Sequence, residues 1–135
     1  AGTSPGNGAL GTTQLAWLGS WLTWAHDNGE KVVIVCHAPY ATGGTKNLWD
    51  ADAVATLIRA QPDGVVALWL NGHTHTYTLG DEAPSVNLLT IPGLVETDVR
   101  NFATLELFNP ATPHPGMVVN GFGDCPDLEL EAFIT

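Results

Sequence analysis

Histidines follow two apolar segments of the chain, close to the point where each segment ends. His37 comes directly after VVIVC, and His73 and His75 lie in the Asn-Gly-His-Thr-His stretch that follows VVALWL. Neutral imidazole is a common ligand for divalent transition metals such as zinc and iron. The sequence therefore raises the question of whether these three rings hold metal, and which elements of the fold position them.

The order of the apolar segments predicts an α/β fold. QLAWLGSWLTWAHD is expected to be a helix, because its leucines and its tryptophans each recur at helical spacing, and this wide apolar face indicates burial against a sheet. KVVIVC (31–36) and VVALWL (65–70) are unbroken apolar runs typical of interior strands. A second helix is expected between them, near 50–60. This order of helix, strand, helix and strand indicates parallel strands joined by helical crossovers.

Parallel strands bring their carboxyl ends to the same edge of a sheet, where ligands of α/β proteins bind. We therefore expect His37, His73 and His75 at one rim, although ordinary loop histidines remain an alternative. Residues two positions apart on a regular strand point to opposite faces. His73 and His75 can thus reach one ion only through a turn, which Gly72 would permit. Otherwise, the two rings address two ions that lie side by side.

Shorter strand-like segments follow the histidines and are expected to be antiparallel. They are YTL, VNLLTI, FATLEL and MVVNGF, with turns at Pro92-Gly93, Asn109-Pro110 and Pro115-Gly116. Residues 1–8 are mostly Gly, Ser, Thr, Pro and Asn, so a flexible lead-in is expected there. Residues 9–135 are then a single domain.

The charge balance restricts the partners of this domain. Four Lys and Arg against fourteen Asp and Glu give a net charge of −10 over 135 residues. This balance argues against binding to nucleic acid or to an anionic membrane, since both would be repelled. A small phosphorylated substrate remains compatible, because a metal ion reverses the charge locally.

The remaining composition gives few further constraints. Cys36 lies in a predicted strand and Cys125 in a loop; a disulfide between them is possible but no framework is indicated. No apolar run is long enough to span a membrane. The amino end shows no signal-peptide pattern, so a cytoplasmic location is slightly favoured, although the composition is also compatible with export.

The segments VIVCHAP and LNGHTHTY resemble the last two motifs of the calcineurin-like metallophosphoesterases. In that family an apolar strand ends in a histidine, and a later strand ends in Gly-His-x-His. The segments GALGTTQLAWLGSWLTWAHDNGEKVVIVCHAP, IPGLVET, FATLELF and GFGDCPDLEL are similar to the manganese-dependent ADP-ribose/CDP-alcohol diphosphatase group within it. The resemblance covers about residues 9–130.

This resemblance implies a fold, a site and an activity. The fold would be half of a two-sheet sandwich, a mixed β-sheet flanked by helices that lacks the N-terminal βαβ part. His37 and His73 would bind one divalent metal (Mn, Fe or Zn) and His75 a second, with His73 also the catalytic candidate. The activity would be hydrolysis of phosphoester or pyrophosphate bonds in a small phosphorylated substrate.

The family takes its other ligands from earlier motifs: Asp-x-His, Gly-Asp-x-x-Asp and Gly-Asn-His-Glu or Gly-Asn-His-Asp. None of these motifs precedes His37 in this sequence, so the resemblance implies only a partial metal site. Local acids could substitute, although several are expected at a helix start or in a hairpin turn. The candidates are Asp50, Asp52, Asp81, Glu82, Glu96 and Asp98.

Two interpretations without catalysis stay open beside the enzyme. The chain could be a metal-binding domain that does no chemistry, or a structural half-domain that self-associates. A half-sandwich would expose apolar sheet surface and strand edges. We therefore expect a homo-oligomer, such as a two-fold dimer, to cover the missing half. His26, beside Asp27 at a helix end, and His114, between two prolines, are expected at the surface.

Overall fold

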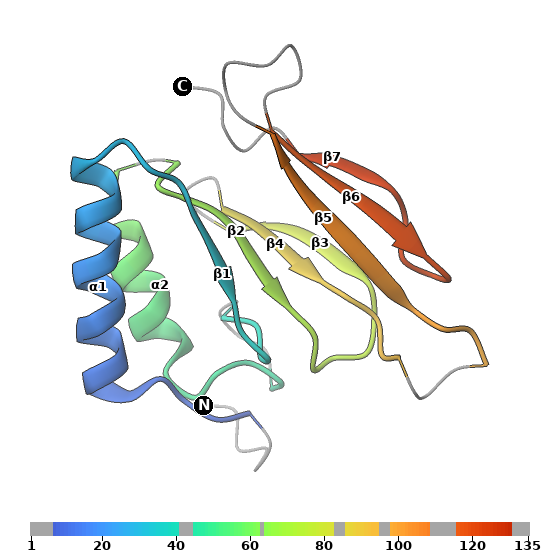
Figure 1. Ribbon diagram of the computed structural model, residues 1–135. Helices are drawn as coiled ribbons and strands as arrows, with labels where there is room; N and C mark the ends of the chain where they lie inside the picture. The colour runs from blue at the N-terminus through green and yellow to red at the C-terminus, as the bar shows by residue number, and fades with distance from the viewer. Residues whose placement is uncertain are drawn as a thin grey trace.

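A computed structural model of the chain describes residues 7–40, 45–62, 64–82, 86–94, 98–108 and 116–130. Within these residues, two helices and seven strands form three layers (Figure 1). Within these ranges no helix is both long and apolar enough to cross a membrane. The elements are α1 (Gly11–Asp27), β1 (Val32–Val35), α2 (Ala51–Arg59), β2 (Val66–Asn71), β3 (Thr78–Glu82), β4 (Val86–Thr90), β5 (Phe102–Phe108), β6 (Gly116–Phe122) and β7 (Leu128–Leu130).

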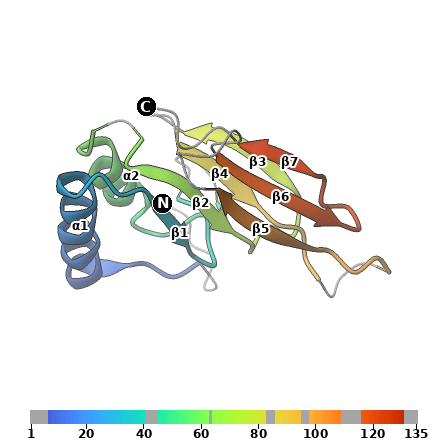
Figure 2. The same ribbon diagram turned by 45° about the horizontal axis from the view of Figure 1, so that its top comes forward.

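The central layer is a mixed sheet with the strand order β1-β2-β4-β3. β1 and β4 both run parallel to β2, while β3 is antiparallel to β4. α1 and α2 cover one face of this sheet, and the antiparallel sheet β5-β6-β7 lies on the other (Figure 1, Figure 2). The α/β class is thus confirmed, as are the helix–strand–helix–strand order and the parallel pairing of the first two strands.

Two strands differ from the expectation. β1 was expected inside the sheet, but in the described part of the chain it pairs only with β2 and forms an edge. An unbroken apolar run indicates burial of both faces and carries no information about neighbours at both edges. β4 was expected to be antiparallel, yet it is parallel to β2, because β3 occupies the outer position and turns back into β4.

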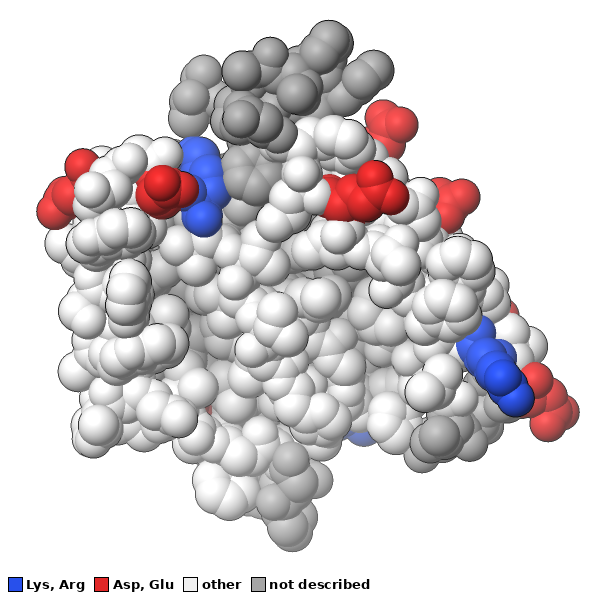
Figure 3. All heavy atoms as spheres, viewed as in Figure 1, with Lys and Arg blue, Asp and Glu red and all other residues white. Residues whose placement is uncertain are grey.

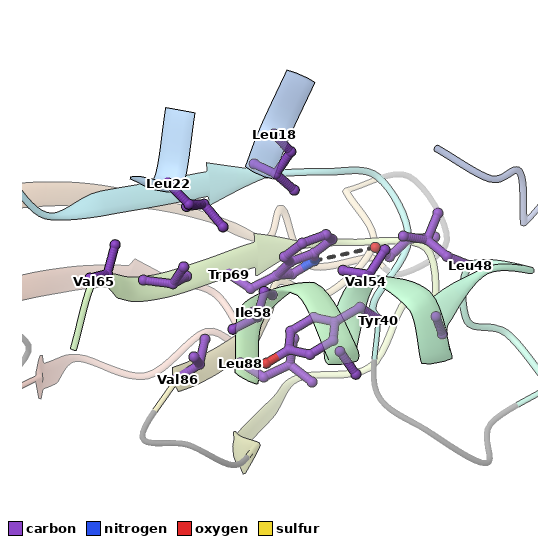
Figure 4. Close-up of a cluster of buried hydrophobic side chains, with 14 of the residues drawn as sticks. Leu18, Leu22, Tyr40, Leu48, Val54, Ile58, Val65, Trp69, Val86 and Leu88 are labelled. Carbon is purple, nitrogen blue, oxygen red and sulfur yellow. Dashed lines mark hydrogen bonds between the residues drawn. The ribbon is translucent and has the colours of Figure 1, made fainter. Parts of the chain in front are cut away.

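The sheet packs on both faces, which explains why VVALWL is apolar throughout. Trp69 points toward the helices and packs with Leu22, Val54 and other buried side chains (Figure 4). Leu68 belongs to the second core, with Met117 and other residues of the opposite sheet. Successive residues of a strand alternate between faces, so both faces of β2 require apolar side chains.

The apolar face of α1 is only partly buried, in contrast to the expectation. Leu18 and Leu22 are buried against the sheet, whereas Trp17, Trp21 and Trp24 are 61%, 50% and 50% exposed. The leucine stripe and Ala25 contact the core, and the tryptophan stripe faces outward beside β1. α1 therefore presents an exposed aromatic surface.

Trp69 links the core to the segment that follows β1. Its indole Nε1 donates to the backbone oxygen of Ala38 at 3.3 Å (Figure 4), and its ring lies 4.7 Å from that of Tyr40. Ala38 directly follows His37, so this buried contact helps to fix the position of that histidine. Cys36 and Cys125 are both free, so the disulfide considered above is not formed.

Replacing Trp69 with Phe removes this hydrogen bond and part of a fully buried side chain. We expect the Trp69→Phe variant to lose roughly 1–3 kcal/mol of unfolding free energy, from the cavity and from the unpaired Ala38 carbonyl. Urea denaturation measures this loss. The matched variant Trp24→Phe, at a half-exposed position, should change stability by less than about 0.5 kcal/mol. Equal effects of the two substitutions would contradict the assignment of Trp69 to the core.

Candidate metal centre

The ends of β1 and β2 bring His37 and His73 together. The backbone pairing continues past both strands: Cys36 N donates to Leu70 O at 3.0 Å, and Gly72 N donates to His37 O at 3.1 Å. The rings meet edge to face, with His73 Nδ1 3.0 Å from His37 Nε2. Two histidines that lie 36 residues apart in sequence are thus adjacent at the rim of the sheet.

The separation of these two nitrogens fits a shared divalent ion. Two imidazole nitrogens bound to one ion at about 2.1 Å, with roughly a right angle between the bonds, lie about 3.0 Å apart. The nitrogens of His37 and His73 are at that distance from each other. The donors are also of the appropriate chemical type, since neutral imidazoles are common ligands for such ions. The pair therefore fits two positions of one metal site.

The loop that carries His73 and His75 has an unusual backbone. His73 has a φ of 64° and His75 a φ of 58°, a left-handed conformation that residues other than glycine rarely adopt. The turn was expected at Gly72, which is not among the residues with positive φ. Such conformations cost about 1–3 kcal/mol each and occur preferentially at functional sites. The fold thus holds both histidines in a strained loop.

His75 packs on the segment after β4. A Cβ atom added to Gly93 would lie 3.1 Å from Cγ of the His75 ring, so this glycine permits the close approach. Among the described residues, no three His, Cys, Asp or Glu side chains form a group that could hold an ion. His75 is therefore near the pair but not part of it, and the alternative of two separate ions is compatible with this arrangement.

Burial lowers the pKa of His73 below the ordinary histidine value of 6.5. The neighbouring His37, Lys46 and His75 lower it further, because each disfavours an additional positive charge nearby. The neutral ring of His73 therefore predominates at neutral pH. Neutral imidazole is the form that binds metal.

Asn7 also contacts this site, although no sequence pattern indicated it. Asn7 is only 3% exposed, and its side chain contacts both His73 Nε2 (2.9 Å) and Thr45 O (2.8 Å). This residue lies within the segment expected to be a flexible lead-in, yet it is packed into the fold. Residues 1–6 of that segment lie outside the described residues.

Asn71, at the end of β2, is hydrogen-bonded to the end of β4. Its Nδ2 donates to Thr90 Oγ1 at 2.9 Å and to Gly72 O at 3.2 Å, which ties the histidine loop to β4. Its Oδ1 is buried and has no hydrogen-bond partner among the described residues. An open hollow of about 380 Å³ lies beside His37 and Asn71, at the carboxyl ends of β1, β2 and β4.

The acidic candidates do not complete the site within the described chain. The Asp50 carboxylate accepts from Leu10 N at 3.1 Å and from Gly11 N at 2.8 Å, so it caps the start of α1. Asp52 lies in the first turn of α2 as expected, and Asp98 is exposed. The backbone of Asp81 and Glu82 lies in β3 rather than in a turn, and Glu96 lies outside the described residues.

The letters Gly-Asp-x-x-Asp do occur once, at Gly123 to Asp127, after His37 rather than before it. There they form the connection between β6 and β7, where Asp127 Oδ1 accepts from Gly121 N at 2.8 Å. Both carboxylates of this segment are on exposed residues and neither joins the histidines. Of the remaining histidines, His26 is exposed as expected and His114 lies outside the described residues.

The fold is similar to that of a solved dimetal phosphatase. A crystal structure of a dimetal phosphatase from Danio rerio matches with a TM-score of 0.80 and 26% sequence identity. The match covers 90% of this chain and 38% of that one. This similarity and the relatives described next support a partial metallophosphoesterase domain, which confirms the resemblance of VIVCHAP and LNGHTHTY to that family.

The sequence is also similar to curated proteins that share one name. Proteins named manganese-dependent ADP-ribose/CDP-alcohol diphosphatase match it, from Mus musculus at 30% identity over 126 residues and from Homo sapiens at 31% over 127 residues. Each match covers 90% of this chain and 35% of the relative, so the chain spans about a third of their length. No protein-family model matches the chain.

Proposed function

We propose that the chain supplies part of the metal site of a phosphohydrolase, in which His37 and His73 bind one divalent ion and His75 a second. The observation that carries this proposal is the 3.0 Å separation of His73 Nδ1 and His37 Nε2 at the ends of adjacent parallel strands. The relatives are named manganese-dependent, so Mn²⁺ is the first ion to test, followed by Fe and Zn. Such ions, when bound, activate water and neutralise charge on phosphate oxygens.

The surroundings of the pair suit a small phosphorylated substrate. The hollow beside His37 and Asn71 is open to solvent at the edge of the sheet. Lys46 lies close enough to His73 to influence its pKa, and it is one of four basic residues in a chain of net charge −10. A cation at this position would attract a phosphate group. The names of the relatives indicate pyrophosphate-linked substrates such as ADP-ribose or CDP-alcohols.

Hydrolysis of phosphate esters tests this function directly. We expect the chain with added Mn²⁺ to hydrolyse bis-p-nitrophenyl phosphate, p-nitrophenyl phosphate or ADP-ribose. The His73→Ala variant should lose at least about 100-fold in rate, because a ligand of the ion is removed. His26→Ala, which removes an exposed histidine outside the site, is the matched control. Turnover that is equal in the His73→Ala variant would contradict the assignment.

A metal-binding domain without catalysis is the second candidate. It is favoured by the absence of a carboxylate beside the histidine pair in the described part of the chain. Binding of Mn²⁺ that is lost in the His73→Ala variant, with no turnover of any ester, would support this candidate over the enzyme.

The exposed surface beside β1 favours self-association in either case. A groove of about 520 Å³ runs between α1 and β1, lined by Trp17, Trp21, Trp24 and others. Val35 of the edge strand is 75% exposed. Charged side chains lie mainly at the margins of this face of the molecule (Figure 3). Apolar surface next to an open strand edge is typical of an interface, and a second copy of the chain would cover it.

We expect light scattering to give twice the chain mass of 14.2 kDa. The Trp21→Glu variant should shift the protein to a monomer, because it places a charge in the centre of the groove. Leu107→Glu, at a position that is 57% exposed on β5, serves as the control and should leave the mass unchanged. A wild-type chain that stays monomeric at high concentration would contradict self-association.

A further inference from the structure

We propose that Asn7 is a positioning residue that determines which nitrogen of His73 carries the proton and how its ring is oriented. The consequence for metal binding rests on the function proposed above, whereas the effect on the ring does not. Asn7 and His73 are 66 residues apart in sequence and meet only through the fold.

The orientation of the Asn7 amide follows from its two contacts. Its Nδ2 lies 2.8 Å from the backbone oxygen of Thr45, which can only accept a hydrogen bond, so the amide nitrogen must face Thr45. The amide oxygen therefore faces His73 Nε2, at 2.9 Å. An amide oxygen can only accept, so Nε2 must be the protonated nitrogen of a neutral His73 ring.

This assignment leaves the other ring nitrogen free of a proton. In the neutral ring only one nitrogen carries hydrogen, so Nδ1 of His73 presents its lone pair toward His37 Nε2, 3.0 Å away. In the absence of metal, His37 then donates from Nε2 to that lone pair. The lone pair is also the group that a divalent ion would bind. Outer partners of this kind fix the tautomer and orientation of ligand histidines.

Asn7 is itself held firmly in place. Trp49 N donates to Gly8 O at 2.9 Å, and the Asp50 carboxylate accepts from Leu10 N and Gly11 N. Hydrogen bonds thus hold the segment 7–11, which carries Asn7 and the start of α1, against residues 45–50. The ring of His73, whose own backbone has a φ of 64°, is held at Nε2 by the buried Asn7 side chain.

Two substitutions separate the contact with His73 from the contact with Thr45. Asn7→Ala removes both. Asn7→Asp keeps an oxygen that accepts from His73 Nε2 but has no amide N–H for Thr45 O. Asn87→Ala is the matched control, because it removes a similar hydrogen bond, from Asn87 Nδ2 to Ala67 O at 3.2 Å. These two residues lie near the starts of β2 and β4, at the edge of the sheet opposite the histidines.

The tautomer is measured by two-bond ¹H–¹⁵N correlation on the metal-free protein with ¹⁵N-labelled histidine. At about pH 8, where a neutral ring predominates, we expect His73 to show the Nε2–H form in the wild type. Asn7→Asp and Asn87→Ala should keep this form, and Asn7→Ala should shift it toward a mixture with Nδ1–H. The Mn²⁺ dissociation constant, from calorimetry, should rise about 10- to 100-fold in Asn7→Ala.

The outcomes separate this inference from the proposed function. An unchanged His73 tautomer in Asn7→Ala would overturn the positioning role of Asn7. A loss of the Nε2–H tautomer that is as large in Asn7→Asp as in Asn7→Ala would also overturn it. A wild-type chain with the Nε2–H form that binds no Mn²⁺ would leave this role in place and refute the metal site. Circular dichroism of each variant confirms that the fold is retained.

Discussion

β1 and β2 run parallel and side by side, and their backbone pairing extends through Cys36 and Gly72 into the histidine segments. Parallel pairing places the ends of both strands at the same edge, so His37 and His73 meet although they lie 36 residues apart in sequence. Trp69 reinforces this register from inside the core, because it bonds to the carbonyl directly after His37. The position of the rings thus depends on a buried sheet rather than on a flexible loop.

The backbone conformation of the loop after β2 is less favourable and needs support from neighbouring residues. His73 and His75 adopt left-handed backbone angles, which a loop held only by its own residues would relax. Support comes from Asn71 toward β4, from Gly93 against the His75 ring, and from Asn7 on the far side of His73. The strain is therefore confined to a loop that is contacted from three directions. Such preorganisation would keep the rings in place for the proposed metal.

The sequence predicted the features that depend on local pattern. Periodicity and apolar runs gave the order of α1, β1, α2 and β2, and strand ends gave the pairing of His37 with His73. Features that depend on long-range contacts were not accessible. Asn7 reads as part of a Gly- and Pro-rich lead-in, and only its contact with Thr45 and His73 shows otherwise. The exposed tryptophans of α1 share the spacing of buried ones, so periodicity alone could not separate the two stripes.

The central claim is that His37 Nε2 and His73 Nδ1 bind one divalent ion. Crystals grown with Mn²⁺ test it most directly, since anomalous scattering locates manganese independently of any catalytic activity. A shared ion would give an anomalous peak within bonding distance of both nitrogens, with His73 Nε2 still in contact with Asn7. The absence of a peak beside the two nitrogens at saturating Mn²⁺, or a peak bound elsewhere, would contradict a shared metal site.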